Sequence, residues 1–185
     1  TGNVVLMSQN FMTGKWEAGL KYLFPLFAFA LGVLIAEQIQ HKYKYAKRLH
    51  WRQGILGAEI IILFIVGFIP QRGNMIATVL VSFACAMQVQ SFRKVNGFSY
   101  ASTMCIGNLR SGTAALSFYL RERRPEQLRQ AMYYLGIIVL FAIGAGIGGN
   151  LSANYGIHMI WVSCGLLIVS FLLMFLDIEA RRSRA

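Results

Sequence analysis

Long apolar runs separated by short polar segments dominate this chain. Five runs approach the roughly 20 residues of helix that cross the hydrocarbon core of a bilayer. They cover residues 23–40, 54–69, 75–92, 132–149 and 158–176. The first run has Pro25 in its expected first turn, where proline is tolerated. The pattern predicts an all-α integral membrane protein with five membrane-spanning helices in this chain.

Basic residues concentrate in the polar segments between these runs. If successive loops alternate between the two sides of a membrane, one side carries only Lys15, Lys21 and Arg72, and the other fifteen cations share the opposite side. Loops rich in Lys and Arg stay in the cytoplasm. We therefore expect a multi-pass protein of the cytoplasmic (inner) membrane with its C-terminus on the cytoplasmic side.

Composition excludes several functional classes. The chain is 56% apolar and 14% charged, with a net charge of +11. A soluble protein this basic would suggest nucleic-acid binding, but cations clustered between apolar runs indicate a lipid bilayer as the partner and no nucleic acid. The three cysteines lie in apolar segments, and no nucleotide loop, Ser/His/Asp set or zinc motif is present. We expect no cofactor, no metal and no enzymatic activity.

The chain contains an internal repeat. Residues 1–5 resemble 106–110, 27–36 resemble 139–148, and the sequence from Ile55 resembles that from Ile160. Because the charge pattern places the two Gly-Asn segments on opposite sides, the repeats are expected to be inverted about an axis in the membrane plane, as in many secondary transporters. We predict one membrane domain of two three-helix units, 1–74 and 75–185. The counterpart of the 75–92 helix would precede Thr1, so the first transmembrane helix would be missing.

The stretch from residue 95 to residue 120 allows two interpretations. An extended entry to Cys105 followed by a half-helix from Asn108 to Leu120 would be re-entrant, with its free N–H groups directed into the membrane. Alternatively, the stretch is a cytoplasmic loop with an amphipathic helix on the membrane surface. The re-entrant interpretation predicts a site for a polar or anionic ligand at the Gly-Asn helix starts, made by Asn3, Gly107, Asn108, Arg110 and Ser111.

Glu59 is the single acidic residue well inside an apolar run. An unpaired acid there costs a few kcal/mol, so it must face the protein interior or hold a proton. One hypothesis is that Glu59 couples transport to a proton or cation. The other is that it pairs with Arg110 or a neighbouring hydroxyl. For Gln88 and Gln90, interhelical hydrogen bonding is favoured over lining a pathway.

The two Gly-Asn motifs also carry a family resemblance. The sequence resembles the YoaK-like family of bacterial multi-pass membrane proteins, a domain-of-unknown-function family, over essentially the whole chain. The residues that carry it are Thr-Gly-Asn-Val-Val-Leu-Met at 1–7, Phe-Ala-Leu-Gly at 29–32, and the segment 101–109. The resemblance implies a bacterial location and a chain that begins after the family's first transmembrane helix. Ile106 departs from the family pattern, in which Thr more often precedes this glycine.

Together these features favour a small secondary transporter or channel-like permease for a polar or anionic small solute. The alternative is a non-transporting membrane scaffold or accessory subunit. The glycines of the fourth run, among them Gly144 and Gly148, would let another helix approach closely. That helix could belong to the same subunit or to a second copy in a homo-oligomer.

Overall fold

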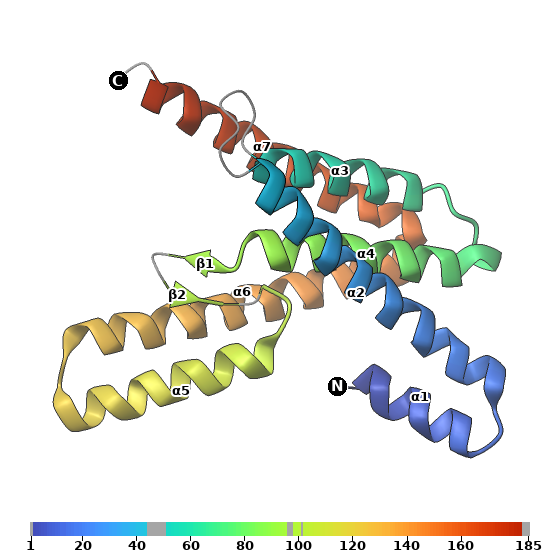
Figure 1. Cartoon of the computed structure of the whole chain (residues 1–185), viewed down its shortest axis with the longest axis horizontal. Helices are drawn as coiled ribbons and strands as arrows, with labels where there is room; N and C mark the ends of the chain where they lie inside the picture. The colour runs from blue at the N-terminus through green and yellow to red at the C-terminus, as the bar shows by residue number, and fades with distance from the viewer. Residues whose placement is uncertain (1, 44–50, 96–97, 101, 183–185) are drawn as a thin grey trace. The chain divides into compact units, whose positions relative to one another are not determined.

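The computed structural model of the chain is helical (Figure 1) and describes residues 2–43, 51–95, 98–100 and 102–182. Its elements are α1 (Gly2–Met12), α2 (Trp16–Tyr43), α3 (Trp51–Val66), η1 (Gln71–Gly73), α4 (Asn74–Ser91), β1 (Lys94–Val95), β2 (Phe98–Ser99), α5 (Cys105–Glu122), α6 (Pro125–Tyr155), η2 (Gly156–Met159) and α7 (Ile160–Arg182). The strands β1 and β2 form a short antiparallel pair. The expected helical fold class is therefore confirmed. Thr1 and most of the basic segment between the first two runs, residues 44–50, lie outside the described residues.

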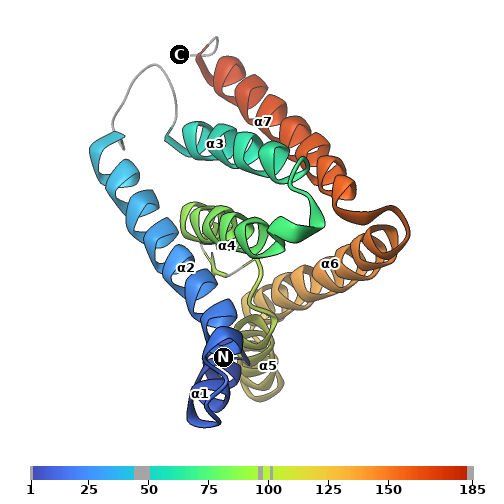
Figure 2. The ribbon, with the colours of Figure 1, turned by 90° about the vertical axis from the view of Figure 1, so that its right-hand side faces the viewer.

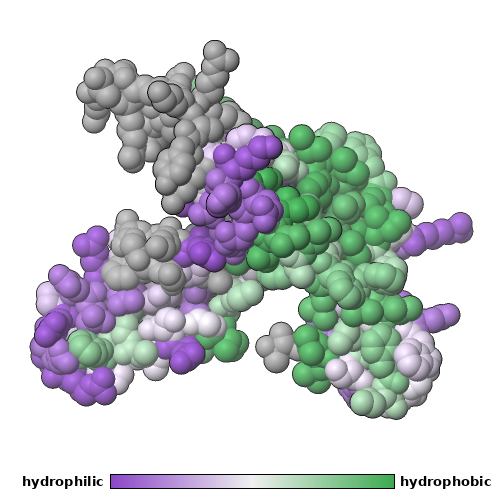
Figure 3. Space-filling view, in the orientation of Figure 1, coloured by the Kyte–Doolittle hydropathy of each residue, from purple (hydrophilic) through white to green (hydrophobic). Residues whose placement is uncertain are grey.

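Three stretches of the described chain are long and apolar enough to cross a membrane. They are Trp16–Tyr43, Gln71–Ser91 and Pro125–Leu176, and the last contains α6 and most of α7. Helix α3 has 16 residues and is therefore only about 24 Å long. Protein covers only 22%, 33% and 6% of the most apolar windows of the three stretches. Figure 3 shows a broad hydrophobic surface over α3 and α4. Apolar surface on this scale needs lipid around it, as in a membrane protein.

The described residues form two compact units. One contains Thr1–Ser91 and Tyr155–Ala185, and the other contains Phe92–Asn154. Each unit is described by itself below. These units reflect contacts between residues, whereas the expected halves 1–74 and 75–185 reflect sequence equivalence, so the predicted halves stay a prediction.

In the first unit, α2 packs closely along α4 (Figures 1 and 2). The buried residues Ala28, Gly32 and Ala36 recur every fourth position on α2 and leave room for α4. A Cβ atom on Gly32 would lie 2.6 Å from the Phe83 carbonyl oxygen and 2.8 Å from the Ala86 Cβ. Glycine at position 32 therefore sets the distance between the two helices.

The position expected for Pro25 was wrong. Helix α2 begins at Trp16, so Pro25 lies inside the helix and not in its first turn. Membrane helices tolerate an internal proline when neighbouring groups satisfy the disturbed backbone. Here the Ser82 hydroxyl of α4 donates a hydrogen bond to the Pro25 carbonyl oxygen at 2.9 Å. This hydrogen bond joins α4 to α2 at the proline, whereas the carbonyl group that loses its helical N–H partner is that of Lys21, one turn earlier.

The second unit is built on the helical hairpin of α5 and α6 (Figure 1). The segment from Asn108 to Leu120 is helical, which fits both interpretations of it, and the helix is longer at both ends, since α5 begins at Cys105 and ends at Glu122. A Cβ atom on Gly112 would lie 3.0 Å from the Tyr134 Cβ of α6, so the two helices are in close contact there. Arg123, in the left-handed conformation with φ 54°, ends α5 and starts the turn into α6.

The two Gly-Asn motifs occupy similar local structures. Each lies near the start of a helix, α1 or α5, that leads through a tight turn into a long helix, α2 or α6. The turns contain residues with positive φ, Gly14 at 72° and Arg123 at 54°. The repeat seen in the sequence therefore has a counterpart in the order of structural elements.

Candidate functional site

Glu59 lies on the interior face of α3 and is 3% exposed. It follows Ile55 by one helical turn and precedes Leu63 by one turn, and both of these residues are buried. Ile55 packs in one apolar cluster with Ala36, Trp51 and Met87, and Leu63 packs in a second with Ala84 and Cys164. The carboxyl group therefore sits between two apolar clusters where α3 meets α4 and α7.

The Glu59 carboxyl group has an oxygen that is open to a further partner. Oε2 is buried and accepts no hydrogen bond from the described part of the chain. Buried polar atoms without partners are rare and call for an explanation such as function or an unseen water. No set of three metal-ligating side chains occurs among the described residues. The oxygen can accept a proton, or a hydrogen bond from a solute.

The hypothesis that Glu59 pairs with Arg110 stays untested. Glu59 belongs to the first unit and Arg110 to the second. Arg110 is exposed on α5.

Helices α3 and α7 lie side by side and run antiparallel (Figure 2). The Trp161 indole Nε1 donates a hydrogen bond to the Phe64 carbonyl oxygen at 3.2 Å. The Cys164 Sγ, one turn after Trp161 on α7, lies 3.9 Å from the Ile60 carbonyl oxygen. Ile60 lies one turn before Phe64 on α3. Residue numbers thus rise along α7 as they fall along α3.

The sequence repeat matches the two segments that cross here. When Ile55 is matched to Ile160, Glu59 corresponds to Cys164 and Ile60 to Gly165. The Cys164 Sγ lies 3.9 Å from the carbonyl oxygen of Ile60, the residue that follows Glu59. The helices α3 and α7 therefore cross close to matched positions, and Glu59 lies at that crossing.

A disulfide can test this antiparallel contact. In a chain with Cys85→Ala and Cys105→Ala that keeps Cys164, we expect Ile60→Cys to form an intramolecular disulfide with Cys164 under a mild oxidant. Intact mass and thiol counting measure the product. The matched control is Ile61→Cys, because Ile61 is 61% exposed on the other face of α3. Equal cross-linking at positions 60 and 61 would contradict the contact.

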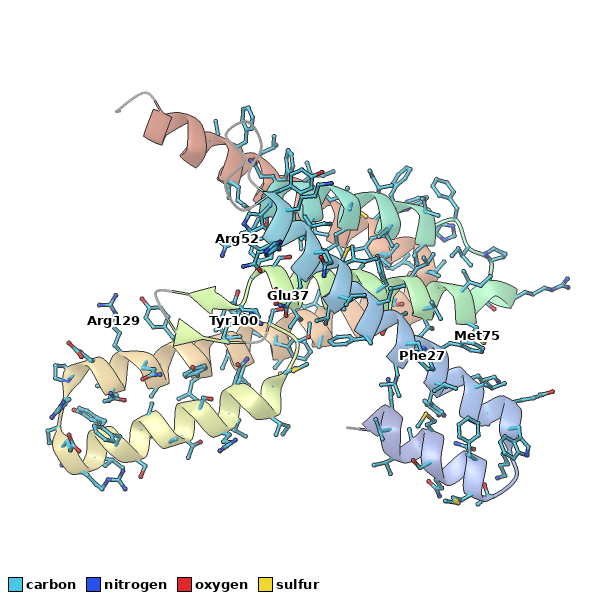
Figure 4. All side chains as sticks on the ribbon, viewed as in Figure 1. Phe27, Glu37, Arg52, Met75, Tyr100 and Arg129 are labelled. Atoms are coloured by element: carbon cyan, nitrogen blue, oxygen red, sulfur yellow. The ribbon has the colours of Figure 1, made fainter. Side chains whose placement is uncertain are left out.

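A second polar group joins α2, α3 and α4 at the start of α3. The Gln90 amide Nε2 donates a hydrogen bond to the Glu37 carboxyl oxygen Oε1, which confirms the interhelical role expected for Gln90. The Arg52 Nε donates to the Ser91 carbonyl oxygen at 3.1 Å. Figure 4 labels Glu37 and Arg52 at this end of their helices. These two hydrogen bonds connect α2, α3 and α4 near the start of α3.

Gln53 was not among the residues expected at a site. It is 2% exposed, and its amide Nε2 has no hydrogen-bond partner among the described residues. The second apolar run appeared to begin at residue 54, which placed Gln53 outside the expected helix. A helix that begins at Trp51 instead turns this side chain into the interior. The only sequence feature that could have indicated the burial of Gln53 is its position directly before an apolar run.

The ligand-binding residues expected on α5 lie on different parts of that helix. Asn108 is 3% exposed, and Ser111, one turn later, is half-buried. Gly107 and Arg110 are exposed, and no described residue lies within 4 Å of a Cβ placed on Gly107. The structure thus brings Asn108 and Ser111 toward one side of α5 and leaves Gly107 and Arg110 on an open side.

Asn3 is exposed near the start of α1. Asn3 and Asn108 belong to separate units. The expected opposition of the two Gly-Asn helix starts therefore stays a prediction, as does the choice between a re-entrant and a surface position for α5. Asn96, Gly97 and Ala101, in the segment leading to α5, lie outside the described residues.

Comparison with known proteins places the chain in a family. The family model described as "Protein of unknown function (DUF1275)" matches residues 1–173. No curated protein and no solved structure matches the chain. The match agrees with the expected YoaK-like resemblance and covers both Gly-Asn motifs, α3 and most of α7. The chain therefore belongs to the DUF1275 family of proteins of unknown function.

Proposed function

We propose that this protein is a small secondary transporter or permease for a polar or anionic solute, with Glu59 as its coupling residue. The observation that carries the proposal is the Glu59 carboxyl group, which is buried beside the crossing of α3 and α7 and has one oxygen that accepts no hydrogen bond from the described residues. Ionisable residues within membrane segments are costly, and they commonly mark ion or substrate pathways.

The crossing of α3 and α7 close to matched positions supports an inverted repeat. In transporters built from inverted repeats, the twofold axis lies in the membrane plane, and the binding sites lie near it at the middle of the bilayer. A twofold axis that exchanged α3 and α7 would be perpendicular to both helices and would pass beside Glu59. Glu59 beside the axis would then be reachable in turn from each side as the two repeats rock against each other.

The coupling step follows from the surroundings of Glu59. A charged carboxylate between two apolar clusters is expensive, whereas a protonated carboxyl group is much less so. The closed protein is therefore expected to hold a proton or a counter-cation on Glu59. Opening to water on either side lets the carboxyl group ionise and release that proton. The polar residues Asn108 and Ser111 on α5 would supply hydrogen bonds to the solute.

The charge pattern supports an orientation in the bacterial inner membrane with the C-terminus in the cytoplasm. Fifteen of the 18 Lys and Arg residues would then lie on the cytoplasmic side. This distribution is the one that the positive-inside rule describes.

Transport can be tested in proteoliposomes that enclose a pH-sensitive dye. A panel of small carboxylates, phosphate and amino acids is added outside, and solute-driven proton movement is recorded. For any solute that the native chain moves, Glu59→Gln is expected to reduce coupled proton movement to the level of empty liposomes. Asn108→Ala is expected to weaken apparent solute affinity by about fivefold to tenfold, the value of one buried hydrogen bond.

Glu126→Gln is the matched control, because it removes an acid that is exposed in the first turn of α6. This variant should transport like the native chain. If Glu59→Gln and Asn108→Ala leave solute flux, proton movement and solute-induced thermal shifts unchanged, the transporter proposal fails.

A scaffold or accessory subunit is the alternative function. The observation that favours it is the open glycine face of α6, where no atom of the described residues lies within 4 Å of a Cβ placed on Gly144, Gly146, Gly148 or Gly149. Small residues on a membrane helix let another helix approach closely. Absence of flux for the whole panel, together with a stable helix partner on this face, would favour the alternative.

A further inference from the structure

A shallow pocket at the turn between α1 and α2 has no part in the proposed transport. It encloses about 480 Å³ and is lined by Gly14, Lys15, Trp16, Glu17, Ala18 and Lys21. None of these residues was expected to bind a ligand. The pocket combines two cations, one acid and one large aromatic side chain.

The turn that forms the pocket is held by packing between α1 and α2. A Cβ atom on Gly19 would overlap the Phe11 ring, so α1 lies directly on α2 at this point. The same Phe11 ring lies 5.4 Å from the Trp16 ring, measured between centroids. Gly14 adopts φ 72°, which lets the chain reverse within a few residues. The pocket is therefore built into the fold without a ligand.

The charged groups around the pocket are available to a ligand. Lys15, Glu17 and Lys21 are exposed, and none of the three forms an ion pair with another described residue. Two ammonium groups attract a phosphate, and a carboxylate accepts hydrogen bonds from a primary ammonium group. The charge pattern fits a ligand that carries both groups.

The position of the pocket along α2 indicates the level of the membrane at which the ligand would bind. Trp16–Tyr43 is long and apolar enough to cross a membrane. The apolar run of this helix begins at residue 23, so the preceding turn lies at the level of the lipid headgroups. The Trp16 side chain is 66% exposed. Tryptophan concentrates at this level because its ring is apolar and its N–H is polar.

We propose that this pocket binds the headgroup of a phospholipid that carries a phosphodiester and a primary ammonium group, as phosphatidylethanolamine does. The phosphate lies between Lys15 and Lys21, the ammonium group bonds to Glu17, and the Trp16 ring packs on the glycerol and upper acyl chain. The site needs neither the inverted repeat nor a role for Glu59. Its failure and the failure of the transport proposal are therefore separate results.

Native mass spectrometry of the detergent-purified chain tests this site. Equal amounts of phosphatidylethanolamine, phosphatidylglycerol and phosphatidylcholine are added, and the bound lipid is counted. We expect phosphatidylethanolamine to be preferred. The double variant Lys15→Gln, Lys21→Gln should weaken its binding by about fivefold for each lysine removed. Lys42→Gln is the control for each single lysine change, because it removes one positive charge at the other end of α2. The control should bind lipid like the native chain.

Two further measurements separate lipid from other sources of phosphate. Glu17→Gln should remove the preference for phosphatidylethanolamine over phosphatidylglycerol and leave overall phosphate binding in place. Excess inorganic phosphate should not displace the lipid, because it lacks the ammonium group and the acyl chains. Displacement by inorganic phosphate, or unchanged lipid binding in the double lysine variant with an unchanged unfolding temperature, would overturn the proposal.

Discussion

Replacing Gly32 with leucine is expected to lower the free energy of unfolding by about 3 kcal/mol or more. Even the first added carbon would lie 2.6 Å from the Phe83 carbonyl oxygen. That oxygen belongs to the backbone of α4, so it cannot rotate away as a side-chain end could. The two helices must separate, and the buried contacts of Ala28 and Ala36 weaken with them.

The measurement is unfolding of the detergent-solubilised chain in mixed micelles of increasing denaturing detergent. Gly57→Leu serves as the control, because no atom in the described part of the chain lies within 4 Å of a Cβ at Gly57 on α3. That variant should unfold close to the native chain, since leucine favours helix more than glycine does. Equal loss of stability in both variants would show that α2 and α4 do not approach closely at Gly32.

Replacing Glu59 with methionine is expected to stabilise the chain by about 1–3 kcal/mol and to abolish solute-coupled proton movement. Methionine has nearly the volume of glutamate and adapts to irregular spaces. It removes a buried oxygen that has no hydrogen-bond partner in the described part of the chain. A residue that costs stability and is required for activity is typical of functional sites.

The same detergent titration measures this gain, and the proteoliposome assay measures the loss of transport. Glu126→Met is the control, because Glu126 is exposed on α6. Its effect on the free energy of unfolding should stay within about 0.5 kcal/mol. A destabilised Glu59→Met variant would mean that the carboxyl group makes stabilising interactions in the folded protein, which would remove the case for a coupling role.

The helices were predictable from the sequence where apolar runs are long. The runs at 75–92 and 132–149 lie within or close to α4 and α6. Helix starts were less predictable, because segments that contain polar residues, such as Trp16-Glu17 and Arg52-Gln53, belong to helices that the apolar pattern alone would begin later. Tertiary contacts decide these ends, as the bond between Arg52 and the Ser91 carbonyl oxygen illustrates.

The candidate site was predictable only in part. Glu59 could be identified because an acid inside an apolar run is conspicuous. Gln53 could not, since its burial depends on where α3 begins and on what packs beside it. The contact between Cys164 and Ile60 could not be predicted from the sequence, because it depends on how α3 packs on α7. The repeat matches these two segments in sequence but does not show that they touch.

The α3–α7 crossing also has a consequence for the stoichiometry of the proposed transport. The two matched positions differ chemically: α3 supplies an acid, Glu59, where α7 supplies a thiol, Cys164. A thiol does not exchange a proton under the same conditions as a carboxylic acid. If Glu59 is the coupling residue that we propose, this pair offers one carboxyl proton per chain. A titration of coupled flux against pH is then expected to have a Hill coefficient of one. Cys164→Glu would place two acids at the crossing and change that slope.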